Sequence, residues 1–571
     1  MLFFYGNVIP MLIKQRELNQ TVYTSCIEAG YPEIVARIIA GRKKTFDKNI
    51  FEFSIESIKP AITMAGAPEA VQRVIKSIHD NEKILIFTDY DVDGCTSMVV
   101  LYKSLHEIFK IPESNLIKLT GHRIEDGYGL TTTVAKKILQ LEPDLVITAD
   151  AGASDNERIE TLAGAGIDVI ITDHHLLPKE GIPQAAFAVV NPQQNNCPYD
   201  SKIAGCGVAW LLMTAVAVEL ECSSKQKQQL HQMLDYIALG TVADIVSLDS
   251  VTNRYFVKKG LEFMNRRNRN CWQIAMDDKE AGVGYLGFQL GPRINASSRI
   301  TGRVDTAIDF LLSEDPDQIC YSYDLLNKHN KTRQGIESKM LGEAKKKVTR
   351  KEPAIVFYSE NNHAGIQGIV ASKLTEKFGV PAIMLADVGN QMVSGSGRAG
   401  QFLHLRDALQ AFDEKIPGVL KTYGGHKAAA GLKLHKDNID LFKEGFYEIV
   451  QEQLEGQDIT PYMKTDGSLN GLINLDTYYQ IDKLMPFGMG FPSPIFYNEM
   501  VATCIRAMGN PSVHLSMQLG RHRAVFFRAL ETPDSPWPVS EGEKVGVVYS
   551  LNLNEWQGRR SLQLIVKRFT G

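Results

Sequence analysis

The sequence predicts an α/β protein that begins with a parallel sheet and ends in a small β-barrel. Three short apolar runs, residues 83–87, 144–148 and 168–172, each have the length and branched aliphatic content of a strand buried on both faces. Helical patterns separate these runs, as expected where helices connect parallel strands. Beyond about residue 465 the pattern changes to short alternating strands and turns, which is typical of an all-β module.

Helical patterns accompany the strands through the first half of the chain. Residues 98–109 and 134–141 suit helices between the first and second runs. Residues 154–164 offer an N-cap Ser and an acidic first turn to a further helix. Residues 208–220 form an apolar helical stretch after the third run, and residues 234–244 form another.

The second half of the chain predicts a connector and two more domains. Strand signals at 354–358 and 382–385, with a helix at 368–378 between them, predict a second α/β domain. The charged, helix-rich stretch before them is expected to be a long helical connector. The expected segments are an N-terminal extension packed on the first domain (1–60), a catalytic domain (61–304), the connector (305–351), the second α/β domain (352–455) and the β-barrel (465–571).

Composition describes an ordinary globular chain of 571 residues, with 44% hydrophobic and 22% charged residues. The net charge of −4 neither indicates nor excludes a nucleic-acid partner, since a local basic groove can coexist with an acidic surface. Eight cysteines without a C-x-x-C pair argue against structural zinc and suit a reducing cytoplasm. The longest apolar stretch, 208–218, is about half of what a membrane span needs. We therefore expect a cytoplasmic protein without a membrane association.

An Asp-x-Asp-x-Asp-Gly motif at residues 89–94 follows the first apolar run. Alternate carboxylates of an extended segment point to one side, and Gly94 allows the chain to turn into the next helix. The alternatives are an EF-hand-like calcium loop and an acidic turn without function. The calcium loop is disfavoured because its twelfth position is Val100 and not the Glu that such loops use.

Acidic and imidazole side chains also follow the other two runs. Asp150 comes after the second run, and Asp173, His174 and His175 come after the third. Adjacent histidines after a buried strand are not typical core residues, and imidazole is a frequent ligand of transition metals. The ends of parallel strands meet at one edge of a sheet, where so many carboxylates repel each other unless cations neutralise them. We therefore expect divalent metal there, with Asp244 as a further candidate ligand.

These residues match, in order and in local context, the phosphoesterase superfamily that is named after its Asp-His-His (DHH) motif. Nearly the whole chain from about residue 80 resembles the bacterial single-strand exonuclease branch of that superfamily, the RecJ family. Further segments that carry the resemblance are 123–130 (RIEDGYGL), 290–299 (LGPRINASSR), 394–398 (SGSGR), 424–431 (GGHKAAAG), 486–492 (PFGMGFP) and 553–563 (LNEWQGRRSLQ).

The resemblance implies a catalytic centre with two Mn²⁺ or Mg²⁺ ions. Asp89 would support the first ion, and His175 would face the scissile phosphate. Two ions about 3.5–4 Å apart can bind a phosphate, generate hydroxide and stabilise the leaving alkoxide. The implied ligands are Asp91 and Asp150 for one ion, and Asp93, Asp150, His174 and Asp244 for the other.

The resemblance also implies contacts with the end of the DNA. Arginine is a natural bidentate partner of phosphate, although salt-bridged surface arginines are the alternative interpretation. Residues 395–398 are expected to be a glycine-rich loop that cradles a terminal phosphate, or else a tight turn. Two histidines beside glycines would line the same cleft or serve the structure. The expected substrate contacts are Arg293, Arg299, His363, Ser396, Arg398 and His426.

The C-terminal module is expected to be an OB-fold that binds single strands. Trp556, Phe526, Phe527 and His514 would offer stacking faces to bases, and neighbouring cations would contact phosphates. The alternative is that these aromatic residues form the barrel core, which must hold for at least one of the two phenylalanines. The cations are Arg521, Arg523, Arg528, Arg559, Arg560 and Lys567.

We predict a metal-dependent 5′→3′ exonuclease that hydrolyses single-stranded DNA in DNA repair and recombination, with the polarity and strand preference taken from the resemblance. The expected partners are single-stranded DNA and a single-strand-binding protein or helicase. One alternative is a DHH-family phosphodiesterase that acts on short oligonucleotides or cyclic dinucleotides, which needs neither the connector nor the barrel. The other is a non-catalytic nucleic-acid-binding scaffold, which has no need of so costly a charge cluster.

Overall fold

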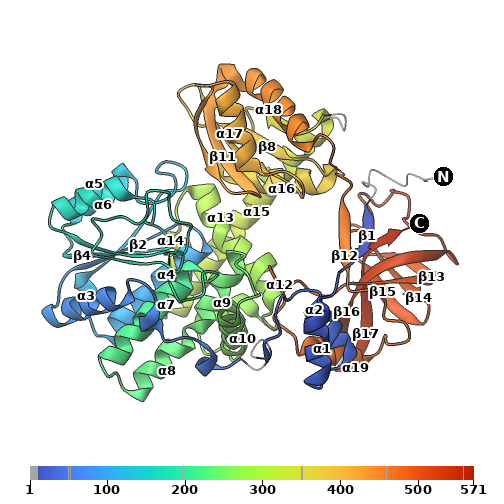
Figure 1. Cartoon of the computed structure of the whole chain (residues 1–571), viewed down its shortest axis with the longest axis horizontal. Coiled ribbons are helices and arrows are strands. Elements are labelled where there is room, and N and C mark those ends of the chain that lie inside the picture. The colour runs from blue at the N-terminus through green and yellow to red at the C-terminus, as the bar shows by residue number, and fades with distance from the viewer. Residues whose placement is uncertain are drawn as a thin grey trace.

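The computed structural model describes residues 11–48, 51, 53–195, 197–348, 352–457, 459–556 and 558–570. Figure 1 shows a large α/β domain, a smaller α/β domain above it, and a β-barrel at the far side of both. The predicted fold class is therefore confirmed.

A five-stranded parallel sheet in the order β3-β2-β4-β5-β6 forms the centre of the first domain. The three predicted apolar runs are β2 (Ile84–Thr88), β4 (Leu145–Ala149) and β5 (Asp168–Thr172), which are buried almost throughout. The sequence did not reveal β3 (Leu116–Thr120) or β6 (Ala188–Val190). The first of these is a partly exposed edge strand, and the second has only 3 residues.

Helices cover both faces of this sheet (Figure 1). On one face lie α3 (Ala67–Asp80), α4 (Val92–Lys103) and α7 (Gly205–Glu219). On the other face lie α5 (Thr132–Leu141) and α6 (Asn156–Gly164). Each face has its own buried apolar cluster, so the strands contribute alternate side chains to two cores.

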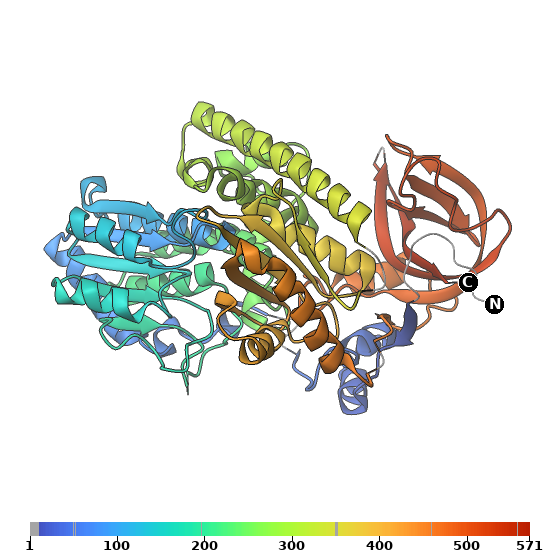
Figure 2. The same ribbon diagram turned by 90° about the horizontal axis from the view of Figure 1, so that it is seen from above.

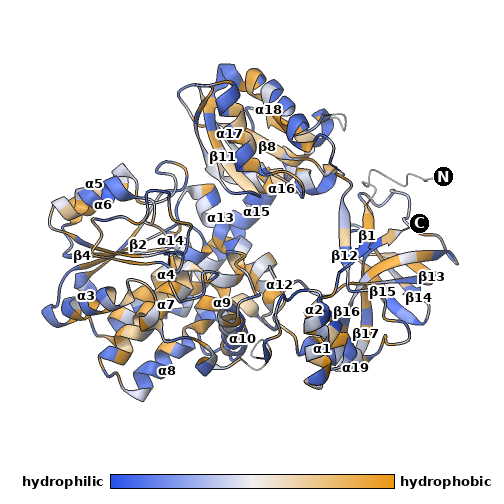
Figure 3. Cartoon of the chain, in the orientation of Figure 1, coloured by the Kyte–Doolittle hydropathy of each residue, from blue (hydrophilic) through white to orange (hydrophobic). Residues whose placement is uncertain are grey.

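Further helices extend the first domain away from the sheet. Helix α7 packs against α3, α4 and α9 (Leu234–Ala243), and α9 packs against α4 and α10 (Val251–Asn265), which suits two helices that are apolar all round. Figure 3 shows both ribbons largely in the hydrophobic colour. Among the described residues, no helix is long and apolar enough to cross a membrane. The remaining helices here are α8 (Ser224–Gln232), α11 (Asn270–Met276), α12 (Val283–Tyr285), the π-helix η6 (Leu286–Leu290), α13 (Gly291–Thr301) and α14 (Asp305–Leu312).

The predicted connector is a single helix, α15 (Pro316–Lys347), of 32 residues. Asp315 caps its N-terminus by accepting a hydrogen bond from the backbone N–H of Asp317, and Pro316 occupies the first helical position. Figure 2 shows this helix reaching from the first domain toward the barrel.

The second α/β domain has a mixed sheet in the order β10-β11-β9-β8-β7, in which only β7 and β8 are parallel. Helices pack on both faces of this sheet, which gives two buried clusters. Its elements are β7 (Ile355–Tyr358), α16 (Gln367–Phe378), β8 (Ala382–Asp387), β9 (Met392–Arg398), α17 (Leu405–Lys415), β10 (Leu420–Gly425), β11 (Ala429–His435) and α18 (Ile439–Leu454).

The expected glycine-rich loop at 395–398 is wrong, because these residues belong to the paired strand β9. The glycines are needed for packing and not for a turn. A Cβ on Gly395 would lie 2.8 Å from side-chain atoms of Leu385 and Leu432, and a Cβ on Gly397 would lie 2.8 Å from Leu405. Ser396 and Arg398, which alternate with these glycines along the strand, face the opposite side of the sheet.

The C-terminal module is a closed five-stranded barrel in the order β13-β14-β15-β17-β16, as predicted. Before it, strand β12 (Tyr462–Thr465) pairs in parallel with β1 (Leu12–Gln15) from the start of the chain. The other elements of this part are α19 (Leu475–Asp482), β13 (Phe496–Met508), β14 (His514–Leu519), β15 (His522–Phe526), β16 (Lys544–Trp556) and β17 (Arg559–Thr570).

The N-terminal segment up to about residue 46 packs mainly on this C-terminal part, whereas Phe53, Ile58 and Lys59 contact the first domain. The expectation that the whole segment packs on the first domain is corrected accordingly. Helices α1 (Gln20–Glu28) and α2 (Glu33–Ala40) share one buried cluster with the barrel. The apolar residues of α2, such as Ile38, need an apolar partner, and they find it beside Leu469 and Leu484. A partner more than 400 residues away leaves no local trace in the sequence.

Two buried arginines contact the C-terminal part, one from the first domain and one from the N-terminal segment. Arg254 of α10 donates hydrogen bonds to the backbone carbonyls of Leu484 at 2.7 Å and Pro486 at 2.9 Å, and its guanidinium lies 4.6 Å from the Phe491 ring centre. Arg42 pairs with Asp466 at 2.5 Å. We call this contact the arginine joint.

Candidate metal centre

The three acidic clusters follow adjacent strands at the same level of the first sheet. Thr88 of β2 is in register with Ala149 of β4, which is in register with Thr172 of β5. The residues after these three positions therefore leave the sheet side by side, at the edge where parallel α/β sheets bind ligands.

The acidic motif after β2 also starts helix α4. Asp91 is the N-cap residue, and its Oδ1 accepts hydrogen bonds from the backbone N–H groups of Asp93 at 2.8 Å and Gly94 at 3.1 Å. A Cβ on Gly94 would lie 2.1 Å from the carbonyl oxygen of Asp89, so only glycine fits there. This tight turn brings all three carboxylates of the motif to the end of the sheet.

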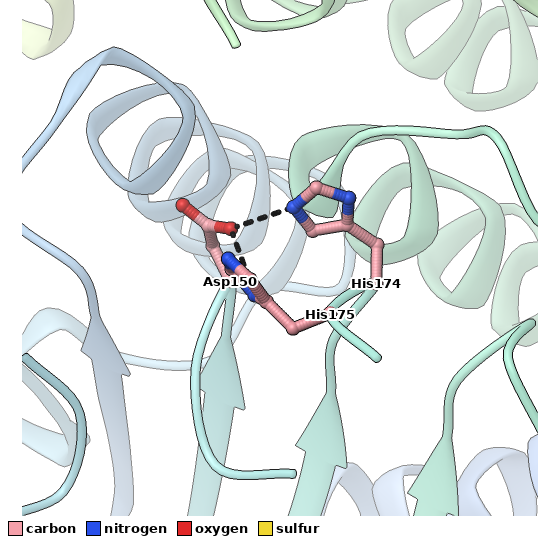
Figure 4. A group of neighbouring side chains, drawn as sticks. All are labelled: Asp150, His174 and His175. Carbon is pink, nitrogen blue, oxygen red and sulfur yellow. Dashed lines mark ion pairs between the residues drawn. The ribbon is translucent and has the colours of Figure 1, made fainter. Parts of the chain in front are cut away.

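His174 lies at the centre of the acidic cluster. Its Nε2 is 3.2 Å from Asp150 Oδ1, 3.5 Å from Asp244 Oδ2 and 3.8 Å from Asp93 Oδ2. Figure 4 shows His174 and His175 both directed at the Asp150 carboxylate, with His175 Nδ1 3.9 Å from its Oδ1. Asp244, which ends helix α9, reaches the cluster from outside the sheet.

Three overlapping groups of side chains place their ligand atoms within 4.8 Å of one another. Two of these groups share Asp150, which therefore lies between two possible ion positions. The groups are Asp89 with Asp91 and Asp150, Asp93 with His174 and Asp244, and Asp150 with His174 and His175.

The electrostatics of the cluster fit bound cations. Burial, followed by repulsion from Asp91, raises the pKa of Asp89 to about 8. Burial and the neighbouring carboxylates likewise raise the pKa values of Asp150 and Asp244 well above their ordinary range. In addition, Asp89 Oδ1 and His174 Nε2 are buried without a hydrogen-bond partner. Unpaired acceptors and mutual repulsion are what divalent ions remove.

His175 differs from His174 because its ring is hydrogen-bonded to a neighbouring carboxylate, that of Asp173. Its Nδ1 is 2.8 Å from Asp173 Oδ1. Burial alone would raise the pKa of Asp173, but the hydrogen bond and the charge of His175 outweigh burial and lower it to about 2. Burial would lower the pKa of His175, but the same hydrogen bond and the charge of Asp173 raise it to about 9. This pair fixes the orientation of the His175 ring.

Tyr128 is a residue of the site that the sequence reading did not single out. Its hydroxyl is 3.0 Å from His175 Nδ1, and it donates a hydrogen bond to the backbone carbonyl of Asp150 at 3.3 Å. Gly127 and Gly129 on either side have φ values of 81° and 82°, so the loop needs both glycines to present this side chain. The sequence feature that could have identified Tyr128 is its position between two glycines in residues 126–129. The family resemblance included this stretch in the segment 123–130 without giving Tyr128 a role.

Arg299 lies in a cluster of arginines beside the acidic motif. Its Nη1 donates a hydrogen bond to the carbonyl of Gly365 in the second domain at 2.9 Å. Burial, and then the positive charges of Arg123, Arg333 and Arg398, lower the pKa of Arg299 to about 9 against the opposing effect of Asp91. Arginines from four different segments thus converge where the two α/β domains meet.

Arg123 was missed by the sequence reading, whereas Arg293 does not join this cluster. The Arg123 guanidinium lies over the Tyr90 ring at 4.9 Å, and its Nη1 donates a hydrogen bond to Ser298 Oγ at 3.3 Å. Arg293, six residues before Arg299 on α13, instead donates hydrogen bonds to Asn327 Oδ1 and to the Gln289 carbonyl. A spacing of six places two helical residues on different faces.

The second domain places Ser396 and Arg398 next to the start of α16. A Cβ on Gly368 would lie 2.8 Å from Arg398 Nη2 and 3.0 Å from Ser396 Oγ. His363 lies just before this helix, where its Nδ1 accepts a hydrogen bond from the backbone N–H of Gly365. His426 lies in the exposed turn between β10 and β11.

The barrel aromatics divide between core and surface. Phe526 contacts Phe569 at 5.6 Å between ring centres and packs against the barrel core. Phe527 is 54% exposed and meets His514 edge to face. The Trp556 side chain lies outside the described residues. One phenylalanine of the pair is therefore available for stacking.

Comparisons with known proteins define the class of this chain. Family models match residues 83–241 (DHH family, N-terminal domain), 351–452 (DHHA1 domain) and 467–568 (RecJ OB domain). The acidic cluster belongs to a DHH phosphoesterase domain that is joined to a DHHA1 domain and an OB domain.

Relatives over the whole length identify the family. "Single-stranded-DNA-specific exonuclease RecJ" of Dickeya dadantii is 32% identical over 94% of this chain and 96% of its own. The Escherichia coli protein of the same name is 31% identical over 97% and 98%. The crystal structure of Thermus thermophilus RecJ in complex with Mn²⁺ matches with a TM-score of 0.81 and 22% identity over 99% of this chain and 80% of that one. The chain belongs to the RecJ family.

Proposed function

We propose that this protein is a metal-dependent exonuclease that hydrolyses phosphodiester bonds of single-stranded DNA from the 5′ end, in DNA repair and recombination. The acidic cluster around Asp150 carries the proposal, because it combines buried unpaired ligand atoms with carboxylates that repel one another. The names of the full-length relatives support the substrate and the type of reaction. The domain boundaries predicted from the sequence are kept as part of the proposal.

The proposed ligands of the first ion follow the group of Asp89, Asp91 and Asp150, and those of the second ion add Asp150 to the group of Asp93, His174 and Asp244. When bound, Mn²⁺ or Mg²⁺ ions supply charge neutralisation and Lewis-acid activation at the phosphate. His175, whose ring Asp173 orients, is proposed to contact the scissile phosphate. The proposed ligands are Asp91 and Asp150, supported by Asp89, for one ion, and Asp93, Asp150, His174 and Asp244 for the other.

The arginine cluster is proposed to bind the terminal phosphate of the strand. Arg123, Arg299 and Arg398 come from two domains and meet beside the acidic motif, with Ser396 adjacent. A terminal monophosphate carries more charge than an internal diester, so a cationic pocket at a fixed distance from the ions favours it and sets the cleavage position. Arg293 remains a proposed contact with the end of the strand, and His363 and His426 remain proposed residues of the same cleft.

The barrel and the partners complete the proposal. Exposed Phe527 and the cations of the barrel would bind the strand by stacking and by phosphate contacts. A single-strand-binding protein or a helicase as partner, and a cytoplasmic location, suit an enzyme whose substrate is exposed single-stranded DNA.

The test is Mn²⁺-dependent digestion of single-stranded and double-stranded oligonucleotides that carry a label at either end. We expect the single strands to be degraded and a 5′ label to be released first in short products. Exclusive cleavage of dinucleotides or cyclic dinucleotides would favour the small-substrate alternative. Binding of DNA without any cleavage in the presence of Mn²⁺ would favour the non-catalytic scaffold.

The phosphate pocket has its own prediction. We expect single strands with a 5′-phosphate to be cut faster than those with a 5′-hydroxyl, and Arg398→Ala to erase most of this difference while sparing metal binding. Initial rates on the two substrates measure the ratio directly. If Arg398→Ala slows both substrates equally, the residue only packs the two domains together and the assignment is wrong.

A further inference from the structure

The carboxylate of Asp93 accepts hydrogen bonds from the first turn of helix α7. Its Oδ2 accepts a hydrogen bond from the backbone N–H of Gly205 at 2.7 Å, and its Oδ1 accepts one from the N–H of Cys206 at 3.0 Å. The first N–H groups of a helix have no acceptor inside the helix, and the helix dipole favours a negative charge beside them. These two hydrogen bonds therefore give the first N–H groups of α7 an acceptor and hold the buried Asp93 carboxylate in one orientation.

Gly205 also lies directly against the shared ligand Asp150. A Cβ at position 205 would be 2.7 Å from the Cβ of Asp150 and 3.0 Å from its Oδ1. Any other residue at this position must therefore displace either Asp150 or the α7 amides. Gly205 consequently determines how closely Asp93 and Asp150 approach each other.

Gly240 of helix α9 also lies against Asp93, next to Cys206 and Thr96. A Cβ there would lie 2.5 Å from both Cys206 Sγ and Thr96 Oγ1, and 2.8 Å from Asp93 Oδ1. Helices α4, α7 and α9 thus meet beside Asp93, and the contact leaves no room for a side chain at position 240. One turn later, α9 ends at Asp244, which points into the acidic cluster.

We propose that Gly205, the Cys206 amide and Gly240 are positioning residues that hold Asp93 at a set distance from Asp150 and Asp244. Each of the two amides donates to one Asp93 oxygen, and each oxygen keeps a further lone pair for another partner; Oδ2 lies 3.8 Å from His174 Nε2. The residues set the spacing of the two ion positions without touching an ion. This inference rests on the proposed metal centre and goes beyond it by naming the support of one ligand.

The test removes one amide hydrogen and leaves the helix intact. Proline is tolerated in the first turn of a helix because the missing N–H has no intrahelical acceptor, so Cys206→Pro deletes the donor to Asp93. Cys206→Ala keeps that donor and changes only the thiol. Lys225→Pro makes the same backbone change at the second position of α8, on the surface and away from the cluster, and serves as the matched control.

Binding of Mn²⁺ to the full chain is measured by calorimetry, and thermal unfolding in EDTA verifies the fold of each variant. We expect two ions in the wild type and in Lys225→Pro. In Cys206→Pro we expect one of the two sites to weaken by about 10–100-fold, the effect typical of an outer-shell partner, and Cys206→Ala to weaken it less. A wild type that binds no Mn²⁺ would contradict the metal centre itself.

Two Mn²⁺ sites of wild-type affinity in a folded Cys206→Pro would overturn the positioning role alone. If Cys206→Pro does not fold, Gly205→Ala decides, because it keeps both amides and adds only the Cβ that meets Asp150. We expect it to lose affinity at one or both sites. Wild-type affinity in Gly205→Ala would show that the contact sets no spacing.

Discussion

Two regions of the molecule bury charged groups, and they treat them in opposite ways. In the arginine joint, every charge has a partner: Arg254 meets backbone carbonyls and aromatic rings, and Arg42 meets Asp466. In the acidic cluster, Asp89 and its neighbours face one another, and the pKa values rise as a result. The protein itself supplies the partners of the charges in the arginine joint, whereas the carboxylates of the acidic cluster need bound cations to offset their repulsion.

Whether a buried charge has a partner within the protein distinguishes a structural contact from a candidate functional site. Burying a charge costs free energy that a well-placed partner offsets, so a satisfied buried arginine stabilises its surroundings or leaves them unchanged. A cluster of like charges without partners destabilises the folded chain and persists only where a ligand uses it. The predictions below change one region at a time, in order of decreasing expected effect.

The largest expected effect is that of Asp150→Asn. This change removes the shared ligand, so we expect cleavage to fall by at least about 10³-fold and at least one Mn²⁺ to be lost. It also removes repulsion, so the unfolding temperature in EDTA should rise. Asparagine tolerates the positive φ of 59° at this position. Digestion assays, calorimetry and thermal unfolding give the three readouts.

Asp235→Asn is the matched control for this experiment. Asp235 is also a buried carboxylate, and it lies on α9, the helix that ends at Asp244. Unlike Asp150, it accepts hydrogen bonds from Arg269 at 2.5 Å and from Trp272 at 2.8 Å. We expect this variant to unfold at a lower temperature and to keep both ions. If both variants shift stability in the same direction, partnered and unpartnered charges do not differ as argued.

The second effect distinguishes the two histidines. We expect His174→Ala to lose an ion, and His175→Ala to keep both ions while its cleavage rate falls by about 10²–10⁴-fold, as for a positioned acid–base or electrostatic group. Metal stoichiometry and single-turnover rates of the two variants give the comparison. Equal loss of metal in both would show that the roles are wrongly divided.

The third effect belongs to the arginine joint. Arg254→Ala leaves the carbonyls of Leu484 and Pro486 without their donor, and we expect the free energy of unfolding to fall by about 3 kcal/mol. Denaturant unfolding measures this change. Mn²⁺ binding to the folded variant should stay at the wild-type level, because no ligand comes from the joint; a loss of metal would mean that the two regions are coupled.

The smallest effect is expected for Tyr128→Phe, which removes one hydroxyl from the His175 ring and from the Asp150 carbonyl. A hydrogen bond of this kind contributes about 1 kcal/mol, so we expect the cleavage rate to fall by about 5–10-fold with Mn²⁺ affinity unchanged. Single-turnover rates at saturating Mn²⁺ measure the change. An unchanged rate would leave Tyr128 as a loop residue only.

The candidate site was largely predictable from the sequence because its ligands follow strands that periodicity identifies. Residues 89–94, Asp150 and His174 each come directly after an apolar run, and parallel pairing then brings them together. Asp244 needed the family resemblance, since nothing local separates it from a surface acid at a helix end.

What sequence reading missed depends on contacts between distant segments. Residues 395–398 were predicted as a loop because glycine occurs both in turns and in strands where neighbours leave no room for a side chain. Here the neighbours are Leu385 and Leu432, which are distant in the sequence. The place of α2 on the barrel and the contact of Gly205 with Asp150 likewise arise only when the chain has folded.

The central claim is that the acidic cluster holds two divalent ions that share Asp150. Anomalous diffraction at the manganese absorption edge, from crystals of the wild-type protein grown with Mn²⁺, tests it most directly. We predict two peaks on either side of Asp150, one toward Asp89 and Asp91 and the other toward Asp93, His174 and Asp244. No peak at the cluster, or a single peak that does not contact Asp150, would contradict the account.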